Sequence, residues 1–192
     1  MPRTDVILFL DLEMTGNTDD DEVVEVGLVL TTREFDVIDD WERIIAPSDW
    51  GMQRIRSNSV VNDMHTKSGL LAELVAIPPR YSSGPPVLFG VDEEICTWLD
   101  KASGTKTEHI PFAGSGVCHF DRKFIHRDFP LFDKRLTYWP YDVGVLRRSW
   151  QLAGLPTATR PADLVGHRAL HDAYAAVSEY REYVRQLRKL KV

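Results

Sequence analysis

The hydrophobic and polar positions of the first 45 residues predict three β-strands. Val6–Glu13 and Val23–Thr31 are rich in valine, isoleucine, leucine and phenylalanine, and Phe35–Ile45 alternates less cleanly. The loops between these runs are too short to contain a crossover helix. The three strands are therefore expected to form an antiparallel meander.

Helical spacing dominates the rest of the chain. Asn58–Ala76 is predicted to be helical with a break near Ser68-Gly69. From about Arg168 to Leu190, apolar residues recur at spacings of three and four, which is one face of a long helix. Asp92 is placed to cap a helix whose first turn carries two glutamates. Two more helices are expected at about His119–Arg127 and at Val143–Leu152.

Two short apolar runs between these helices, His109–Ala113 and Trp139–Val143, are candidates for further strands. The stretch Ile77–Pro86 holds four prolines and is expected to be a surface loop. No repeat or linker interrupts the sequence. Residues 1–192 are therefore expected to form one α/β domain, with three strands first and helices interleaved with two more strands afterwards.

Composition supports a folded domain and narrows the range of partners. The 192 residues are 43% hydrophobic and 27% charged, which are globular values. The apolar runs fall far short of the roughly 18 residues that a membrane span requires, and no signal sequence is evident. Two cysteines, Cys96 and Cys118, fit a reducing compartment, so the cytoplasm is the expected location. The net charge of −6 disfavours a protein that grips long nucleic acid by phosphate neutralisation alone.

Two acids end the first predicted strand. Asp11 and Glu13 are two residues apart, so their side chains point to the same face about 7 Å apart. The five apolar residues before Asp11 indicate a central strand, where a carboxylate without a partner is costly, although a strand end that meets solvent is the alternative. Mg²⁺ and Mn²⁺ prefer carboxylate oxygens, and acids that converge from separate elements would hold such ions. Bound cations would also offset part of the net negative charge.

Asp121 is the candidate for a third acid. It lies in Phe120–Ile125, whose apolar residues would pack inward and carry Asp121 to the buried edge of a helix. An aspartate at the start of a helix commonly serves as a cap, so this residue alone supports either interpretation.

His167 and Asp172 supply a candidate base and a fourth candidate acid. Five helical residues turn through about 500°, so the two side chains would not share a face if both were helical. We expect His167 in the loop behind Gly166, where its imidazole can take a proton from water, and Asp172 in the first turn of the last helix, facing a metal. A zinc pair of His167 and His171 is a weaker alternative, because a His-Glu-x-x-His motif and a cysteine cluster are missing. His171 is instead expected on the surface or in packing.

These residues resemble the three motifs of the DEDDh 3′-to-5′ exonucleases of the proofreading-exonuclease superfamily. The matching segments are Asp11-x-Glu13-x-Thr15-Gly16, Phe120-Asp121-x-x-Phe124 and His167-x-Ala169-x-x-Asp172. Within the superfamily the chain resembles the oligoribonucleases, through Asp11–Gly16, His65–Leu70 and the segment from Asp142 to Trp150. The resemblance implies an RNase H-like fold, in which a five-stranded mixed sheet, made of the meander and two further strands, carries helices on both faces.

The resemblance also implies an activity. The expected reaction is 3′-to-5′ hydrolysis of short single-stranded RNA to nucleoside 5′-monophosphates, with two ions of Mg²⁺ or Mn²⁺ in the active site. His167 would remove the proton of the attacking water. The expected metal ligands, which complete the catalytic set with His167, are Asp11, Glu13, Asp121 and Asp172.

Further residues are expected to bind the substrate on the same grounds. They are Met14, Thr15, Gly16, His65, Ser68 and Tyr138. A solvated helix break is the alternative for the segment around His65 and Ser68, and burial is the alternative for Tyr138 and its aromatic neighbours Trp139 and Tyr141.

The sequence departs from the oligoribonucleases at several places, including Gly116-Val117 and Phe120 before Asp121, and two further departures concern substrate binding. The oligoribonucleases usually carry a leucine after Thr-Gly that wedges between two bases, and Asn17 stands here instead. Their His-Tyr-Arg segment clamps the terminal phosphate across a dimer, and Tyr138-Trp139-Pro140 takes its place. These changes weaken the case for a strict dinucleotide preference, while a homodimer is one expected arrangement.

Two other functions stay open. One is a single-strand DNA or proofreading-type 3′-to-5′ exonuclease. The sequence does not identify a residue that contacts a 2′-hydroxyl, and this contact is what distinguishes RNA from DNA. The other is a non-catalytic nucleotide-binding domain. Retention of all five motif residues counts against the second, since a pure binder gains nothing from clustered acids.

Overall fold

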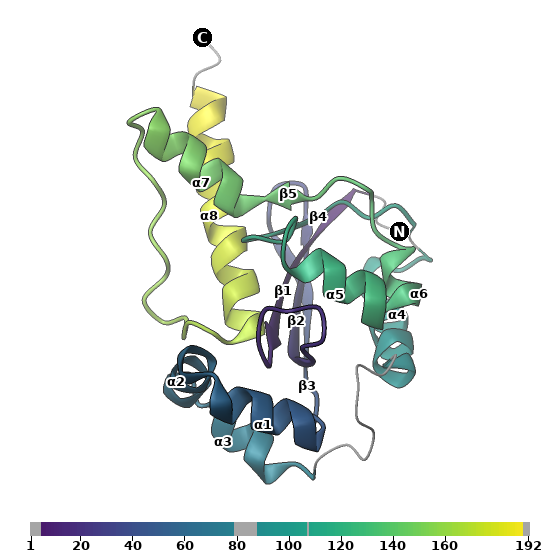
Figure 1. Ribbon diagram of the computed structural model, residues 1–192. Helices are drawn as coiled ribbons and strands as arrows, with labels where there is room; N and C mark the ends of the chain where they lie inside the picture. Colours follow the sequence, from purple (N-terminus) through teal and green to yellow (C-terminus); the bar gives the residue numbers. More distant parts are fainter. Residues whose placement is uncertain (1–4, 79–87, 107, 190–192) are drawn as a thin grey trace.

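The computed structural model describes residues 5–78, 88–106 and 108–189, and a five-stranded mixed sheet lies at its centre (Figure 1). The first three strands pair antiparallel, which confirms the predicted meander. The last two strands pair parallel on its other side. The order across the sheet is β3 (Val37–Ile44), β2 (Val23–Thr32), β1 (Val6–Met14), β4 (Phe112–Gly114) and β5 (Tyr141–Asp142).

The helices of the described residues follow the predicted pattern, with two additions. They are α1 (Asp49–Ser57), α2 (Ser59–Lys67), α3 (Leu70–Ala76), α4 (Phe89–Ser103), α5 (Asp121–Asp128), α6 (Pro130–Asp133), α7 (Val143–Leu152) and α8 (Ala169–Lys189). The predicted break between α2 and α3 is confirmed, and Gly69 takes a left-handed conformation there, with φ of 82°. Neither α1 nor α6 was predicted, because α6 is a single turn and α1 buries only Gly51 and Ile55.

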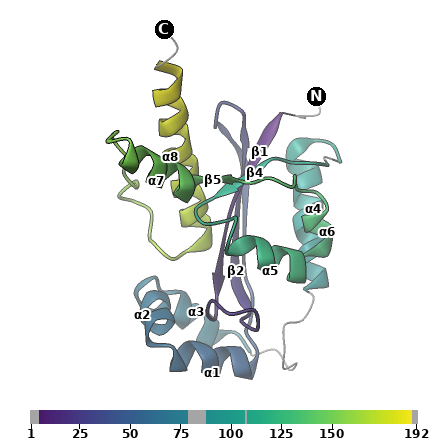
Figure 2. The same cartoon turned by 45° about the horizontal axis from the view of Figure 1, so that its top comes forward.

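Central strand β1 divides the apolar core in two. Its leucines at even positions pack against α4, α5 and α6 on one face of the sheet. Ile7 and Phe9 pack against α7 and α8 on the other face. Figure 2 shows the sheet nearly edge-on between these two groups of helices, as predicted. Because residues two apart share a face, Asp11 and Glu13 continue the row of Ile7 and Phe9 toward α8.

Asp92 caps a different helix from the one predicted. Helix α4 begins at Phe89, so Asp92 lies within its first turn. The buried carboxylate of Asp92 accepts hydrogen bonds of 2.8 Å from the backbone N–H groups of Leu131 and Phe132. Asp92 therefore caps α6, which is distant in sequence, and the local pattern around Asp92 could not show this.

Helix α8 approaches the sheet closely because residue 27 of β2 is a glycine. A Cβ at Gly27 would lie 2.1 Å from the backbone nitrogen of Leu170. Any other residue would push the start of α8 away from β2. Gly27 thus helps to set how near the residues at the start of α8 come to the end of β1.

Helices α1, α2 and α3 lie together at the end of the sheet where β1 ends and β2 begins (Figure 1). Val24 of β2 packs there with buried residues of α1 and α3, namely Ile55, Leu70 and Leu74. This small core places α2 beside the last residues of β1.

Three expectations concern the surface. No helix in the described part of the chain is long and apolar enough to cross a membrane. The expected loop at Ile77–Pro86 lies mostly outside the described residues. Cys96 and Cys118 are both free thiols, the first partly buried and the second exposed.

Candidate active site

Two segments that are far apart in the sequence meet at the end of β1. Asp172 lies in the first turn of α8, toward which Asp11 and Glu13 point, and His167 lies just before that helix. One ligating atom from each of Glu13, His167 and Asp172 lies within 4.8 Å of the other two. No other such group of histidine, cysteine and acidic residues occurs in the described ranges.

Asp121 joins the same strand end from α5. It is the first residue of α5, and its Oδ1 accepts a hydrogen bond of 3.0 Å from the backbone N–H of Leu12. Leu12 stands between Asp11 and Glu13, so this buried bond brings a third element to the acids. Glu13 and Asp172 are the two predicted acids in the compact group with His167, and Asp11 and Asp121 lie near enough to interact electrostatically with them.

Burial raises the pKa values of these carboxyl groups. It raises the pKa of Asp11 well above its usual range, that of Glu13 to about 8 and that of Asp121 to about 7. Repulsion adds to the rise, chiefly from Asp121 at Asp11 and from Asp172 at Glu13. Clustered carboxylates are the donor set that hard divalent cations bind, so the residues fit the implied metal site.

His167 is held by its backbone while its side chain stays exposed. Its φ of 60° places it in the left-handed region, and its N–H donates a hydrogen bond of 2.9 Å to Oδ2 of Asp172. Its neighbour His171 accepts a hydrogen bond of 2.9 Å at Nδ1 from the backbone of Val165. His171 thus fastens the loop that carries His167, a role that the sequence did not suggest.

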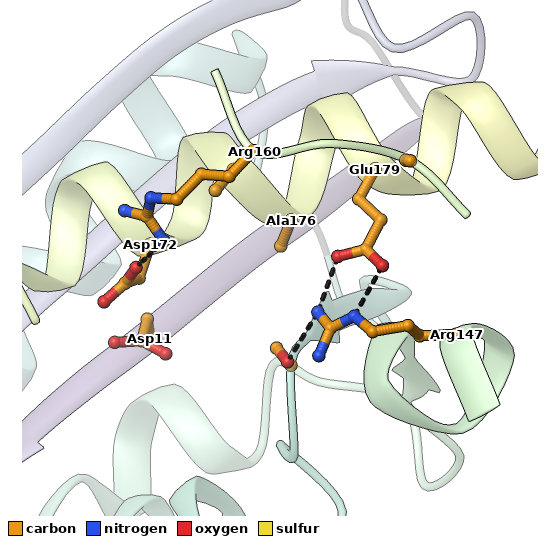
Figure 3. A pocket seen from close by; sticks show the side chains of 9 residues that line it. Asp11, Arg147, Arg160, Asp172, Ala176 and Glu179 are labelled. Carbon is orange, nitrogen blue, oxygen red and sulfur yellow. Dashed lines mark hydrogen bonds and ion pairs between the residues drawn. The ribbon is translucent and has the colours of Figure 1, made fainter. Parts of the chain in front are cut away.

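A cavity of about 460 Å³ opens beside Asp11 and Asp172 (Figure 3). We call it the arginine cavity, because Arg147 and Arg160 line it. Arg147 donates hydrogen bonds of 2.7 and 2.6 Å to the two oxygens of Glu179, whereas Arg160 forms an ion pair with Asp172. An anion that approaches the acids from this side meets two guanidinium groups.

A second cavity, of about 350 Å³, adjoins Glu13. We call it the apolar cavity, because most of its wall is aliphatic or aromatic; its lining includes Met14, Gly16, Asn17, Val60, His65 and Phe120. Three of these residues are among the predicted substrate-binding residues. The end of β1 therefore separates a charged cavity from an apolar one.

His65 is buried in the wall of the apolar cavity. Its Nε2 lies 2.9 Å from the carbonyl oxygen of Met14, and its Nδ1 lies 3.8 Å from Glu13. Burial lowers the pKa of His65, so the neutral ring is favoured, with Nε2–H donating to the Met14 carbonyl. This bond ties α2 to the last residue of β1.

Three other predicted substrate-binding residues line neither cavity. The hydroxyl of Thr15 donates to Asp21 and accepts from the N–H of Glu22, so it stabilises the turn after β1. The buried hydroxyl of Ser68 bonds to the carbonyl of His65 at the helix break. Tyr138 is 77% exposed and lies beside Trp139, which is 78% exposed, so burial does not explain this aromatic pair.

Glu25 is a fifth acid at this end of the sheet, and it is not among the residues predicted from the sequence. It is buried opposite Glu13 on β2 and accepts hydrogen bonds of 2.8 Å from the N–H of Ala169 and 2.9 Å from the guanidinium of Arg168. It therefore fastens the start of α8. A glutamate amid the valines of a buried strand was the available signal.

Known proteins are similar in sequence to this chain over nearly its whole length. The oligoribonuclease of Streptomyces avermitilis is 32% identical over 186 residues, which cover 93% of this chain and 85% of that protein. The chain belongs to the oligoribonuclease family. Among further oligoribonucleases, that of Corynebacterium diphtheriae is 29% identical over 189 residues, which cover 96% of this chain and 84% of that protein. A probable oligoribonuclease of Dictyostelium discoideum is 27% identical over 192 residues, which cover 94% of this chain and 90% of that protein.

Solved structures agree with the oligoribonuclease assignment at the level of the fold. The zinc-bound complex of Escherichia coli exonuclease I with single-stranded DNA matches with a TM-score of 0.63 at 15% identity, over 98% of this chain and 42% of that protein. Apo exonuclease I matches with a TM-score of 0.61 at 14% identity, over 96% of this chain and 42% of that protein. The predicted RNase H-like fold is thereby confirmed. No family model matches the chain.

Proposed function

We propose that this protein is a divalent-metal-dependent 3′-to-5′ exoribonuclease that hydrolyses short single-stranded RNA to nucleoside 5′-monophosphates. The observation that carries the proposal is the convergence of four acids from β1, α5 and α8, with an exposed imidazole beside them. Membership of the oligoribonuclease family supports it independently.

Asp11, Glu13, Asp121 and Asp172 would hold the metal. Two ions of Mg²⁺ or Mn²⁺, when bound, would supply a polarised water and offset the charge that builds on the phosphate. The protein contributes rigid placement of the carboxylates, since Asp121 is bonded to the backbone of β1 and Asp172 to the backbone of His167.

His167 would act as the general base. Its backbone bond to Asp172 fixes the residue, while the exposed ring can reach a water near Glu13 and Asp172. The attacking water gives its proton to the imidazole, and the phosphodiester bond to the 3′ oxygen breaks as the new bond to phosphorus forms. The 3′ oxygen leaves with the bonding electron pair and takes a proton from solvent, which gives the shortened RNA a 3′-hydroxyl. The imidazole serves this step through its unprotonated ring nitrogen, which accepts the proton.

The apolar cavity would take the terminal nucleoside. Its aliphatic and aromatic wall suits the faces of a nucleobase, while Glu13 at its edge places the adjoining phosphate near the acids. Asn17 lines this cavity where oligoribonucleases usually carry a wedging leucine, so we propose a preference for short RNA without strict selection of dinucleotides.

A homodimer is also proposed, with exposed Tyr138 available to substrate in the partner's site. The 77% exposure of Tyr138 supports this role, because most of its side chain is not packed against its own subunit and is free to contact a ligand. Size-exclusion chromatography with light scattering tests the dimer, and a monomer that keeps full activity would contradict it.

The function is tested with 5′-labelled RNA and DNA of two to about 24 nucleotides, in Mg²⁺, Mn²⁺ or EDTA. We expect a ladder of shortened RNA products only with divalent cation, and none with Asp11→Asn or His167→Ala. Asp163→Asn is the matched control, because Asp163 is exposed on the loop before α8. Equal or faster hydrolysis of long DNA would favour the DNA exonuclease instead, and undiminished activity of both variants would end the assignment.

A further inference from the structure

Arg160 makes an unusual set of contacts for a residue beside an acidic site. Its guanidinium pairs with Oδ1 of Asp172 and also donates hydrogen bonds of 3.0 Å to the carbonyl of Val165 and 3.3 Å to that of Leu164. In Figure 3 the side chain extends along α8 and ends at Asp172, close to Asp11. The guanidinium of Arg160 therefore links the loop before His167 to Asp172, an expected metal ligand.

This ion pair opposes metal binding at Asp172. A guanidinium and a divalent cation both need the negative charge of the same carboxylate, and the other oxygen of Asp172 already accepts the N–H of His167. A cation that binds Asp172 must weaken or replace the pair with Arg160. The pair is partly exposed, with 38% of the Arg160 side chain and 19% of the Asp172 side chain accessible, so solvent weakens it and a divalent cation can compete with the guanidinium.

The second arginine of the cavity differs in this respect. Arg147 donates hydrogen bonds to both oxygens of Glu179. Glu179 is not among the expected metal ligands, so metal binding does not displace Arg147 from it. Arg160 has no acidic partner other than Asp172 within the part of the chain that the structure describes. When it is released from Asp172, it becomes an available guanidinium in a cavity of about 460 Å³ next to Asp11.

We propose that Arg160 is a displaceable cation: it neutralises Asp172 while the metal site is unfilled and binds the substrate phosphate once metal has taken that carboxylate. The proposal rests on the proposed function, because it requires both a divalent cation and a phosphate at this site. A guanidinium suits the second role, since its planar fork binds phosphate oxygens in pairs. The substrate class it recognises is a terminal nucleotide phosphate.

The test compares wild-type protein with Arg160→Gln in two binding measurements by isothermal titration calorimetry. Without nucleotide, the variant should bind Mn²⁺ about three- to tenfold more tightly, because the competing charge is gone. With saturating Mg²⁺, it should bind adenosine 5′-monophosphate about tenfold more weakly, because a charged hydrogen-bond donor is lost. Arg160→Lys keeps the charge without the fork and should fall between the two proteins in both measurements.

Arg33→Gln is the matched control, since Arg33 pairs with the exposed Asp5 after β2, at the opposite end of the sheet. It removes the same charge and should change neither affinity. Unchanged Mn²⁺ affinity or unchanged nucleotide affinity in Arg160→Gln would overturn the proposal. If wild-type protein binds neither ligand, the proposed function itself fails, which separates that outcome from a failure of the role of Arg160.

Discussion

The arginine cavity and the apolar cavity share one strand end but differ in chemistry. Asp11 lines the first, and the residues just after it, from Leu12 to Met14, line the second. Two guanidinium groups and three carboxyl groups are among the side chains that line the first cavity, whereas most of the wall of the second is aliphatic or aromatic. A nucleotide has the same division, with a charged phosphate and a flat base, so in the proposed function the phosphate would bind on one side of the end of β1 and the base on the other.

The largest expected effect is that of Asp11→Asn, which should lower activity while it stabilises the metal-free protein. Asp11→Asn should lower kcat on short RNA by more than about 1,000-fold, since metal stabilisation of the reacting phosphate supplies several kcal/mol. The same variant should raise the melting temperature in EDTA, because it removes a buried carboxylate that its neighbours repel. Single-turnover hydrolysis and thermal unfolding measure the two effects. Activity within tenfold of wild type would show that Asp11 is not a ligand.

His167→Ala should lower kcat by about 100- to 10,000-fold, which is the usual contribution of a general base. Mn²⁺ affinity should change little, because the proposed ligands are the four carboxylates. Calorimetry with Mn²⁺ therefore distinguishes a base from a ligand at this position. A loss of Mn²⁺ affinity greater than tenfold would place the imidazole of His167 on the metal.

The buried acids predict how stability depends on pH. Burial raises the pKa of Glu13 in the folded protein to about 8, above its ordinary value of 4.5. The folded state then binds this proton more tightly than the unfolded state, so metal-free protein loses stability as pH rises from about 4.5 through about 8. Divalent cations relieve this loss, because they bind the deprotonated carboxylates.

The stabilisation by Mg²⁺ should accordingly be greater at pH 8 than at pH 6. We expect the difference between melting temperatures in Mg²⁺ and in EDTA to grow by more than about 3 °C, since 1 kcal/mol shifts a domain of this size by roughly 2–4 °C. Differential scanning calorimetry measures it. An effect of Mg²⁺ that stays constant over this range would mean that the acids are already ionised without metal.

The smallest expected effect tests the apolar cavity alone. Val60→Glu places a negative charge on its rim, where Val60 is 66% exposed, and should raise KM about three- to tenfold with little change in kcat. Val75→Glu is the control, because Val75 is 58% exposed on α3 and lines a different cavity. Steady-state hydrolysis of short RNA compares them. Equal effects of the two substitutions would remove the apolar cavity from substrate binding.

Much of the architecture could be predicted because its signals are local. Apolar runs joined by short loops indicated the meander, and spacings of three and four indicated α8. The residues missed depend on distant partners: Asp92 caps a helix about 40 residues away, and Glu25 holds the start of α8 from across the sheet. No pattern in the neighbouring sequence reveals such a partner.

The amino-acid sequence by itself determined which chemical groups are available: two acids on one face of a strand, an acid opening α5, and an acid and an imidazole around the start of α8. Side-chain direction within one element follows from its own periodicity. Only the tertiary structure decided which groups meet, because contacts such as Leu12 with Asp121, or Arg160 with Asp172, depend on how elements pack. The division into a charged and an apolar cavity arises at that level, from helices packed on opposite sides of one strand end.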